Sequence, residues 1–252
     1  MIKVRNLKKY YGDKNVVNNV SINLEKGRLI SFIGANGAGK STVLSMVSRL
    51  ISKDSGEIII EGRELSQWDN SELSKKLSIL PQANYMNIRL KVRELVSFGR
   101  FPYSQGRLTK EDNRIIDEAL NYMGLKEYEN RYIDELSGGE RQMSFIAMTI
   151  AQDTEYIFLD EPLNNLDMKH SSEIMKILRR LVDELKKTVI IVIHDINFAS
   201  CYSDYIVALK KGEVIKEGGT DEIIDKNVLK EIYDLDIHIE SVKGKKICNY
   251  FQ

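Results

Sequence analysis

The sequence predicts an α/β fold, with a mixed sheet core, an antiparallel β subdomain at the N-terminal end and an inserted α-helical subdomain. Three observations lead to this prediction. Residues 2–5 and 20–24 alternate between apolar and polar side chains, as half-buried antiparallel strands do. Residues 156–159 and 189–193 are nearly continuous apolar runs, which suits parallel strands covered on both faces. Between these regions, residues 83–152 show helical spacing and no convincing strand.

A glycine-rich segment follows the apolar strand expected at residues 29–33 and opens a helix expected from Lys40 to about Leu50. It fits the phosphate-loop pattern G-x-x-x-x-G-K-[ST] with Gly34, Ala35, Asn36, Gly37, Ala38, Gly39, Lys40, Ser41 and Thr42. The glycines let backbone N–H groups face a phosphate, and the helix adds its positive dipole end. Lys40 can then reach the β- and γ-phosphates, and Ser41 can ligate Mg²⁺. An ordinary glycine-rich turn needs no Lys-Ser pair, so this segment predicts a nucleotide site.

Other local patterns complete the expected elements. Residues 56–65 predict a strand region, residues 205–217 a hairpin, and residues 171–185 a helix that completes a βαβ unit. The two turns are expected at Glu61-Gly62 and Lys211-Gly212, and Thr109 with Asp112 has the capping-box spacing of a helix that Gly124 would end.

Gln82 stands where the core is expected to pass into the helical subdomain. A glutamine at this junction can contact the metal or the attacking water and move with the subdomain, and an ordinary polar loop residue stays equally open. Tyr11, followed by Gly12, can stack on adenine through its ring face. Tyr10 could do so instead, and packing of either ring in the core stays open.

The start of another expected helix provides a second candidate anion site. Ser137 and Glu140 have the spacing of a capping box, in which the Glu140 carboxylate accepts a backbone N–H. Gly138 and Gly139 leave the same helix start bare and approachable, and a bare helix N-terminus attracts anions. One chain therefore carries two phosphate-binding ends, far apart in sequence.

Acidic and imidazole side chains follow the two buried strands. Asp160 and Glu161 come after the first, so Asp160 is expected to hold the metal and Glu161 to orient or deprotonate the attacking water. His194 follows the second strand and is expected near Glu161, because parallel neighbours present their C-terminal ends together. His170 and His238 have no such support and are interpreted as surface or structural residues.

Composition limits the function classes. The 252 residues include 37 basic and 37 acidic side chains, so no overall field steers the protein onto nucleic acid or anionic lipid. Cys201 and Cys248 form no C-x-x-C motif, which fits a reducing cytosol. No signal peptide is recognised, and the run at residues 189–193 is far shorter than the ~20 residues that span a bilayer. A membrane role is therefore expected to need a partner that spans.

These motifs together resemble the ATP-binding cassette (ABC) ATPase family, in order and spacing, from Tyr11 to about Glu217. Glu140 stands in place of the usual glutamine, and Asn164-Asn165 in place of the frequent Ser-Ala. The resemblance implies a P-loop NTPase fold and an ATPase that uses ATP and Mg²⁺. It also implies an ATP sandwich with a second copy, in which each ATP lies between one chain's phosphate loop and the other's Ser137, Gly138 and Gly139, with Asp167 at the seam.

The same resemblance implies one cassette domain. Its core covers about residues 1–82 and 153–220, its helical subdomain about 83–152, and a C-terminal extension about 221–252. The expected function is the energy-coupling subunit of an importer, at the cytoplasmic face of the membrane. Exporter motors and soluble cassettes acting on DNA or ribosomes are alternatives, although soluble relatives usually carry a coiled coil or two fused cassettes. No nucleic-acid partner is expected.

Residues 92–103 resemble a stretch found in importers of iron–siderophores, haem and cobalamin, with an ordinary helix and turn as the alternative. The groove between this stretch and Gln82 is the expected docking surface for a membrane permease. Residues 97–107, 160–170 and 194–200 resemble Gram-positive ferric siderophore importers of the catecholate, petrobactin type. Partners implied by this resemblance are permease subunits and, indirectly, a siderophore-binding protein, with haem and cobalamin as alternative substrates.

Overall fold

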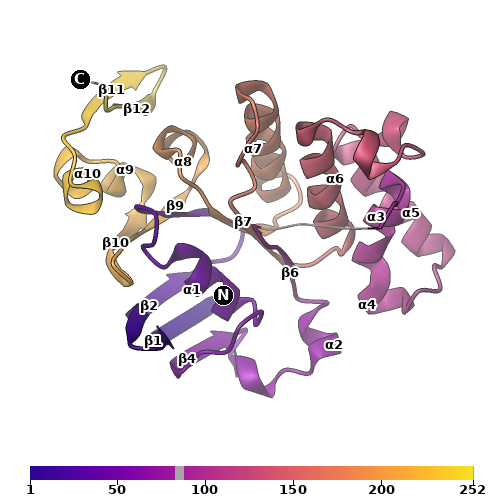
Figure 1. Ribbon diagram of the computed structural model, residues 1–252, viewed down its shortest axis with the longest axis horizontal. Helices are drawn as coiled ribbons and strands as arrows, with labels where there is room; N and C mark the ends of the chain where they lie inside the picture. The colour runs from indigo at the N-terminus through magenta and orange to yellow at the C-terminus, as the bar shows by residue number, and fades with distance from the viewer. Residues whose placement is uncertain (83–87, 252) are drawn as a thin grey trace.

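A computed structural model describes residues 1–82 and 88–251 of the chain (Figure 1). Its central sheet has the strand order β10-β9-β3-β8-β7-β6. Five neighbouring strands run parallel, and β10 pairs antiparallel with β9 at one edge. The strands are β3 (Leu29–Ile33), β6 (Leu77–Leu80), β7 (Tyr156–Asp160), β8 (Thr188–Val192), β9 (Tyr205–Lys210) and β10 (Glu213–Gly219). The predicted mixed sheet is confirmed.

A second, antiparallel sheet is built mainly from the N-terminal part of the chain. Its order is β2-β1-β4-β5, formed by β1 (Ile2–Tyr11), β2 (Lys14–Leu24), β4 (Ser55–Ile60) and β5 (Arg63–Glu64). The turn between β4 and β5 falls at Glu61 and Gly62, which have φ angles of 53° and 82°. The predicted N-terminal β subdomain is therefore confirmed, and its first two strands are longer than the alternation at 2–5 and 20–24 indicated.

The central sheet has two apolar faces because its strand residues alternate between them. Ile30 and Phe32 belong to the cluster formed with the N-terminal sheet and α1 (Lys40–Val47). Leu29 and Ile33 belong to the other cluster, which contains side chains of α7 (Met168–Asp183) and α8 (Ile196–Tyr202). Figure 1 shows α1 and the N-terminal sheet on one side of the central sheet and α7 and α8 on the other. This covering explains the continuous apolar runs.

The helical region lies beyond the β6 edge of the central sheet (Figure 1). Its helices are α3 (Val92–Ser97), α4 (Phe101–Ser104), α5 (Lys110–Tyr122) and α6 (Gly138–Ala151). The capping box of Thr109 and Asp112 is present at the start of α5, and Gly124 follows the helix with a φ of 67°. Turns of 3₁₀ helix occur at Leu65–Gln67, Phe98–Arg100, Lys126–Tyr128 and Ile133–Glu135, and the short α2 (Asn70–Leu73) precedes β6.

The C-terminal residues form α9 (Thr220–Ile223), α10 (Lys226–Tyr233) and a hairpin of β11 (His238–Val242) and β12 (Lys245–Asn249). The Asn197 side chain of α8 exchanges two hydrogen bonds with the backbone of Cys248, and the Ser200 hydroxyl donates to the Lys246 carbonyl. The extension is thus fastened to α8. Among the described residues, none of the helices is long and apolar enough to cross a membrane.

Two sequence-based expectations about helix limits were wrong, and one strand was missed. The helix expected to reach Leu50 ends at Val47, because the Ser48 hydroxyl bonds back to the Leu44 carbonyl and Arg49 turns to a φ of 64°. Leu50 is consequently 51% exposed. The helix expected at 171–185 begins at Met168 and ends at Asp183, and the strand at 77–80 was not recognised as one. The lower limit expected for the helical subdomain, at 83, lies outside the described residues.

Candidate active site

The phosphate loop joins β3 to α1 in a shape that excludes side chains at two glycines. Gly34 has a φ of 142°, and a Cβ there would lie 2.1 Å from the Leu209 carbonyl oxygen. Gly39 has a φ of 96°, and a Cβ there would lie 2.8 Å from the Val16 carbonyl oxygen. Both positions therefore need glycine, for backbone conformation and for space. At these two glycines the loop packs directly against the backbone of β9 and β2.

Lys40 begins α1 and is buried, although its ammonium group is charged. Its Nζ donates to the carbonyl oxygens of Gly34 at 2.8 Å and Ala35 at 3.1 Å. Burial lowers the pKa of this ammonium group. The side chain thus curls back over its own loop, where a phosphate with its negative charge would be a stronger partner than two carbonyl groups.

Ser41 and Asp160 meet beside the loop. The Ser41 hydroxyl donates to Asp160 Oδ1 at 2.7 Å, and Asp160, the last residue of β7, is buried. Burial raises the pKa of the Asp160 carboxyl group. A hydroxyl oxygen and a carboxylate are the hard oxygen donors that suit Mg²⁺, so the residue types fit that ion.

Glu161 lies at the centre of a polar cluster at the C-terminal end of the parallel strands. Its Oε1 lies 2.6 Å from His194 Nε2, and its Oε2 accepts from Gln82 Nε2 at 2.6 Å. The Asn164 amide also donates to this carboxylate. The expected proximity of His194 to Glu161 is therefore confirmed. Gln82 reaches the same carboxylate, so it is more than a solvated loop residue in this structure.

A cavity of about 760 Å³ opens over these groups. It is lined by Asn36, Gly37, Ala38, Gly39, Lys40, Ser41, Thr42, Gln82, Glu161, His194 and also Lys14, Val16, Asn164 and Asn165. Lys14 and Val16 were not proposed from the sequence, although Lys14 is a cation close after the Tyr11-Gly12 pair. Gly34, Ala35 and Asp160 are not among the lining residues.

The two candidate adenine-stacking rings lie outside that lining. Tyr10 is 43% exposed and Tyr11 54% exposed at the end of β1, so neither is packed in the core. The Lys9 ammonium lies 5.5 Å from the centre of the Tyr11 ring. The structure thus excludes core packing as the reason for these tyrosines and leaves both rings partly exposed.

The signature segment, residues 136–140, opens α6 with the expected capping box. The Ser137 hydroxyl and the Glu140 carboxylate bond reciprocally to each other's backbone N–H groups. Hydrogen bonds from Ser137 lower the pKa of Glu140. Gly138 is exposed with nothing within 4 Å of a Cβ position, whereas Gly139 is buried. None of these residues lines the large cavity, and neither does Asp167, the N-cap of α7.

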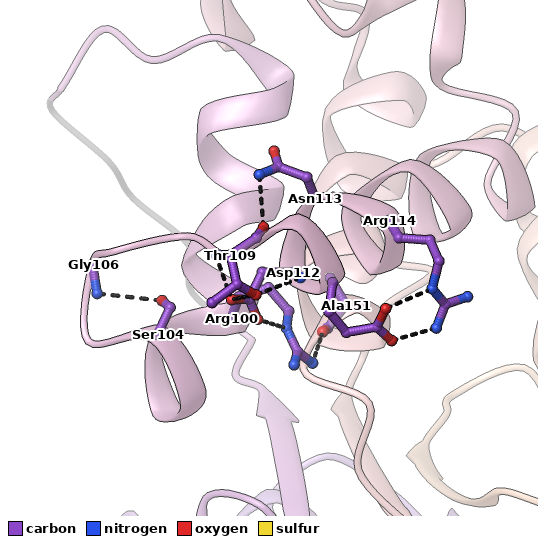
Figure 2. Close-up of polar contacts among 9 residues, drawn as sticks. Arg100, Ser104, Gly106, Thr109, Asp112, Asn113, Arg114 and Ala151 are labelled. Atoms are coloured by element: carbon purple, nitrogen blue, oxygen red, sulfur yellow. Dashed lines mark hydrogen bonds and ion pairs between the residues drawn. The ribbon is translucent and has the colours of Figure 1, made fainter.

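The segment of residues 98–105 is fastened to the helical region by one buried arginine (Figure 2). Arg100 Nε donates to Asp112 Oδ1 at 2.9 Å, and its Nη1 donates to the Ala151 carbonyl at 3.0 Å. Both charged side chains are 5% exposed. The Arg100 guanidinium also lies 4.0 Å from the Tyr103 ring centre. Phe98 and Phe101, by contrast, are exposed, so the segment presents rings on a rigid base.

A family model, described as ABC transporter, matches residues 17–164. The chain belongs to the ABC transporter family. The cassette is 62% identical, over all of both chains, to the petrobactin import ATP-binding protein YclP of Bacillus subtilis (strain 168). It is 48% identical to the petrobactin import ATP-binding protein FatE of Bacillus anthracis, over 97% of each chain.

Solved structures agree with this membership. A metal-chelate type ABC transporter in an inward-facing conformation aligns with a TM-score of 0.85 and 25% identity, over 99% of the cassette and 96% of that chain. The dimeric structure of MJ0796, a bacterial ABC transporter cassette, aligns with a TM-score of 0.78 and 33% identity, over 87% and 99%. The cassette has the predicted ABC ATPase fold and is an ATP-binding and ATP-hydrolysing subunit.

Proposed function

We propose that this cassette powers the import of ferric siderophores of the catecholate, petrobactin type, from the cytoplasmic face of the cell membrane. The observation that carries the proposal is the full-length identity of 62% to a petrobactin import ATP-binding protein. The exposed rings of Phe98 and Phe101, held on the Arg100 base, support a permease contact. A siderophore-binding protein would act on the far side of the membrane and never touch this chain.

The phosphate loop and the ends of β7 and β8 are proposed to bind and hydrolyse ATP. Lys40 would leave the Gly34 and Ala35 carbonyls for the β- and γ-phosphates, and the loop N–H groups would hold the remaining oxygens. Ser41 and Asp160, joined at 2.7 Å, would hold Mg²⁺, which supplies positive charge to the phosphates. Gln82 would stand close to both the metal and the attacking water.

Glu161 is proposed as the base or orienting group for the attacking water. In the structure its two oxygens are engaged by His194 and Gln82, each at 2.6 Å. Binding of the γ-phosphate would attract the His194 ring, and one carboxylate oxygen of Glu161 would then be free to accept the water proton. His194 thus stabilises the γ-phosphate and releases Glu161 in the same movement.

The complete site is proposed to need a second copy of the chain. Ser137, Gly138 and Gly139 form an anion-binding helix start that does not line the chain's own cavity. Facing a partner's phosphate loop, this end would close over the partner's ATP, with Asp167 at the seam and Tyr11 or Tyr10 against adenine. The dimeric form of MJ0796 supports such an assembly.

The subdomain division is part of this proposal. The core would comprise about 1–82 and 153–220, the helical subdomain about 83–152 and the extension 221–252. The permease would dock between residues 92–103 and Gln82, where Ile88, Phe98 and Phe101 are exposed. A contact at this point reaches both the Glu161 cluster and the helical subdomain, so docking and hydrolysis can be coupled.

Uptake of radiolabelled iron tests the substrate. Deleting the gene should abolish energy-dependent uptake of a ferric catecholate siderophore, while surface binding of the complex survives. Haem and cobalamin uptake, measured in the same strain, serve as the competing outcomes. Unchanged uptake of every siderophore tested, with no substitute ATPase expressed, would contradict the assignment of a ferric siderophore as the substrate. Loss of haem or cobalamin uptake alone would show that the cassette powers the import of that substrate instead of a siderophore.

A further inference from the structure

His170 connects the N-terminal ends of two helices that have separate places in the proposed sandwich. Its backbone N–H donates to Asp167 Oδ1 at 2.8 Å. Its ring Nδ1 lies 2.9 Å from each oxygen of the same carboxylate. Asp167 is the N-cap of α7, and these contacts with His170 lower the pKa of its carboxyl group. The Asp167 carboxylate therefore holds the imidazole at the start of α7.

The other side of the ring rests on the signature segment. A Cβ built at Gly139 would lie 2.4 Å from both Cγ and Cδ2 of His170 and 2.8 Å from its Nδ1. No side chain fits at position 139 while the ring stays where it is. Gly138, one residue earlier, has open space around it. The absence of a side chain thus has a different effect at each position. At Gly138 it leaves the helix start open to solvent, and at Gly139 it leaves space for the His170 ring.

The imidazole is more enclosed than the side chains of the two residues before it. Its side chain is 21% exposed, whereas Met168 is 86% exposed and Lys169 is also exposed. The ring contributes nothing that the helix cap requires, because the backbone N–H of residue 170 makes that bond whatever the side chain is. Its contacts instead join Asp167 to Gly139.

We propose that His170 is a positioning residue that holds the signature segment at a fixed distance from Asp167. This inference rests on the proposed two-chain sandwich. In that assembly Ser137 and Gly138 of one copy bind the ATP of the other, and Asp167 lies at the seam. The ring therefore acts on the partner's ATP and not on the ATP bound by its own chain.

Mixed dimers in the purified transporter show whether His170 acts on the partner's ATP or on the ATP bound by its own chain. A chain with Lys40→Ala cannot serve its own nucleotide, so the surviving site combines its signature segment with the partner's phosphate loop. Placing His170→Ala on the same chain as Lys40→Ala should lower the remaining ATP turnover by roughly 10-fold or more, since misplaced groups cost that much. Placing His170→Ala on the opposite chain should leave the remaining turnover close to that of Lys40→Ala alone.

The same pair of arrangements with Ser137→Arg is the positive control. If Ser137→Arg depends on the arrangement and His170→Ala does not, the inference about His170 is overturned and the sandwich stands. If neither depends on it, the proposed sandwich itself fails. Lys169→Ala, at the exposed neighbouring position, is the matched control and should leave turnover unchanged in both arrangements.

Two further variants divide the contacts of the ring. His170→Asn keeps a donor for Asp167 and loses the ring over Gly139, and His170→Phe keeps a ring and loses the donor. Each should reduce kcat by less than His170→Ala, while ATP binding to the isolated chain is unchanged. Thermal unfolding of each variant checks that the fold is intact, and equal kcat for all three variants and the unaltered chain would contradict the proposal.

A rescue experiment tests the contact itself. Gly139→Ala should nearly abolish ATP turnover, because its methyl group and the imidazole compete for the same space. Adding His170→Ala to Gly139→Ala removes that competition and should raise turnover by about 10-fold over Gly139→Ala. No recovery in the double variant would mean that Gly139 is required for another reason, and the proposed positioning by His170 would be withdrawn.

Discussion

Glu161 Oε1 lies 2.6 Å from His194 Nε2, and each residue follows the C-terminal end of its own parallel strand. The pair forms because β7 and β8 are neighbours in register, with Asp160 opposite Val192. Glu161 takes a φ of 51°, which turns its side chain out of the strand direction toward the cavity. The carboxylate and the imidazole thus face the phosphate loop from one edge of the sheet.

Glu161→Gln should keep ATP binding and lower hydrolysis by roughly 10²–10⁴-fold, because the amide cannot accept the water proton. The variant should accumulate as an ATP-bound dimer, measured by size-exclusion chromatography and by nucleotide content. Glu127→Gln, an exposed carboxylate in the helical region, is the matched control and should turn over normally. Near-normal turnover of Glu161→Gln would rule out the proposed role.

Asp160→Asn should raise the Mg²⁺ concentration needed for half-maximal hydrolysis, because the neutral amide replaces the charged oxygen donor beside Ser41. The Ser41 hydroxyl can still donate to the amide oxygen, so the local fold is expected to persist. Mg²⁺ titrations of ATPase activity measure the shift, and chelation by EDTA should stop hydrolysis in the unaltered cassette. An unchanged Mg²⁺ dependence in Asp160→Asn would exclude this carboxylate as a metal ligand.

Lys40→Ala and Ser137→Arg should depend on their arrangement in mixed dimers. Lesions on opposite chains fall in one composite site and leave the second site whole. Lesions on one chain damage both sites, so this arrangement should be the less active. Lys40→Ala should also weaken ATP binding to the isolated chain, whereas Ser137→Arg should not. Equal activity of the two arrangements would contradict an active site shared between copies.

Arg100→Ala should lower the free energy of unfolding by about 3–5 kcal/mol, because it leaves the buried Asp112 carboxylate without its cation. Chemical denaturation with a spectroscopic readout measures the loss. Arg107, an exposed arginine in the loop before α5, is the matched control, and Arg107→Ala should change stability by no more than about 0.5 kcal/mol. Comparable unfolding of Arg100→Ala and Arg107→Ala would show that the buried pair does not hold this region.

The stabilisation by Asp112 should vanish in acid. Hydrogen bonds from the Thr109 hydroxyl and backbone N–H, with Arg100, lower the pKa of Asp112 below its ordinary value. Its contribution is therefore complete above the unfolded-state pKa of about 3.9 and is lost as the pH falls through the lower folded-state pKa. The difference in unfolding free energy between the unaltered chain and Asp112→Asn should narrow in that window, and a constant difference would contradict it.

The sequence was most informative where function imposes a local pattern. The segment from Gly34 to Thr42 predicted its own strand, loop and helix start, because positive φ angles and close backbone approach leave glycine as the residue that fits. The Ser137–Glu140 capping box was equally local. The meeting of His194 with Glu161 was predictable as well, since it needs nothing beyond adjacent parallel strands.

Other features depended on segments that are distant in the chain. The strand β6 was not predicted, because pairing with β7 decides where a short apolar run becomes a strand. Lys14 lines the cavity through the pairing of β2 with β1, which brings it back to the phosphate loop. The sequence left His170 as a surface or structural residue, and its contact with Gly139 appeared only once α6 and α7 were placed together.

By itself the sequence determined the mixed α/β fold, the phosphate loop, the signature segment and the carboxylates at the end of β7, because each is fixed by neighbouring residues or by strand periodicity. Only the tertiary structure decided which side chains touch across the fold. The buried Arg100–Asp112 pair, the Gln82–Glu161 contact and the imidazole of His170 over Gly139 each join segments that chain spacing cannot place. Such contacts depend on packing, in which a shift of one helix changes every neighbour.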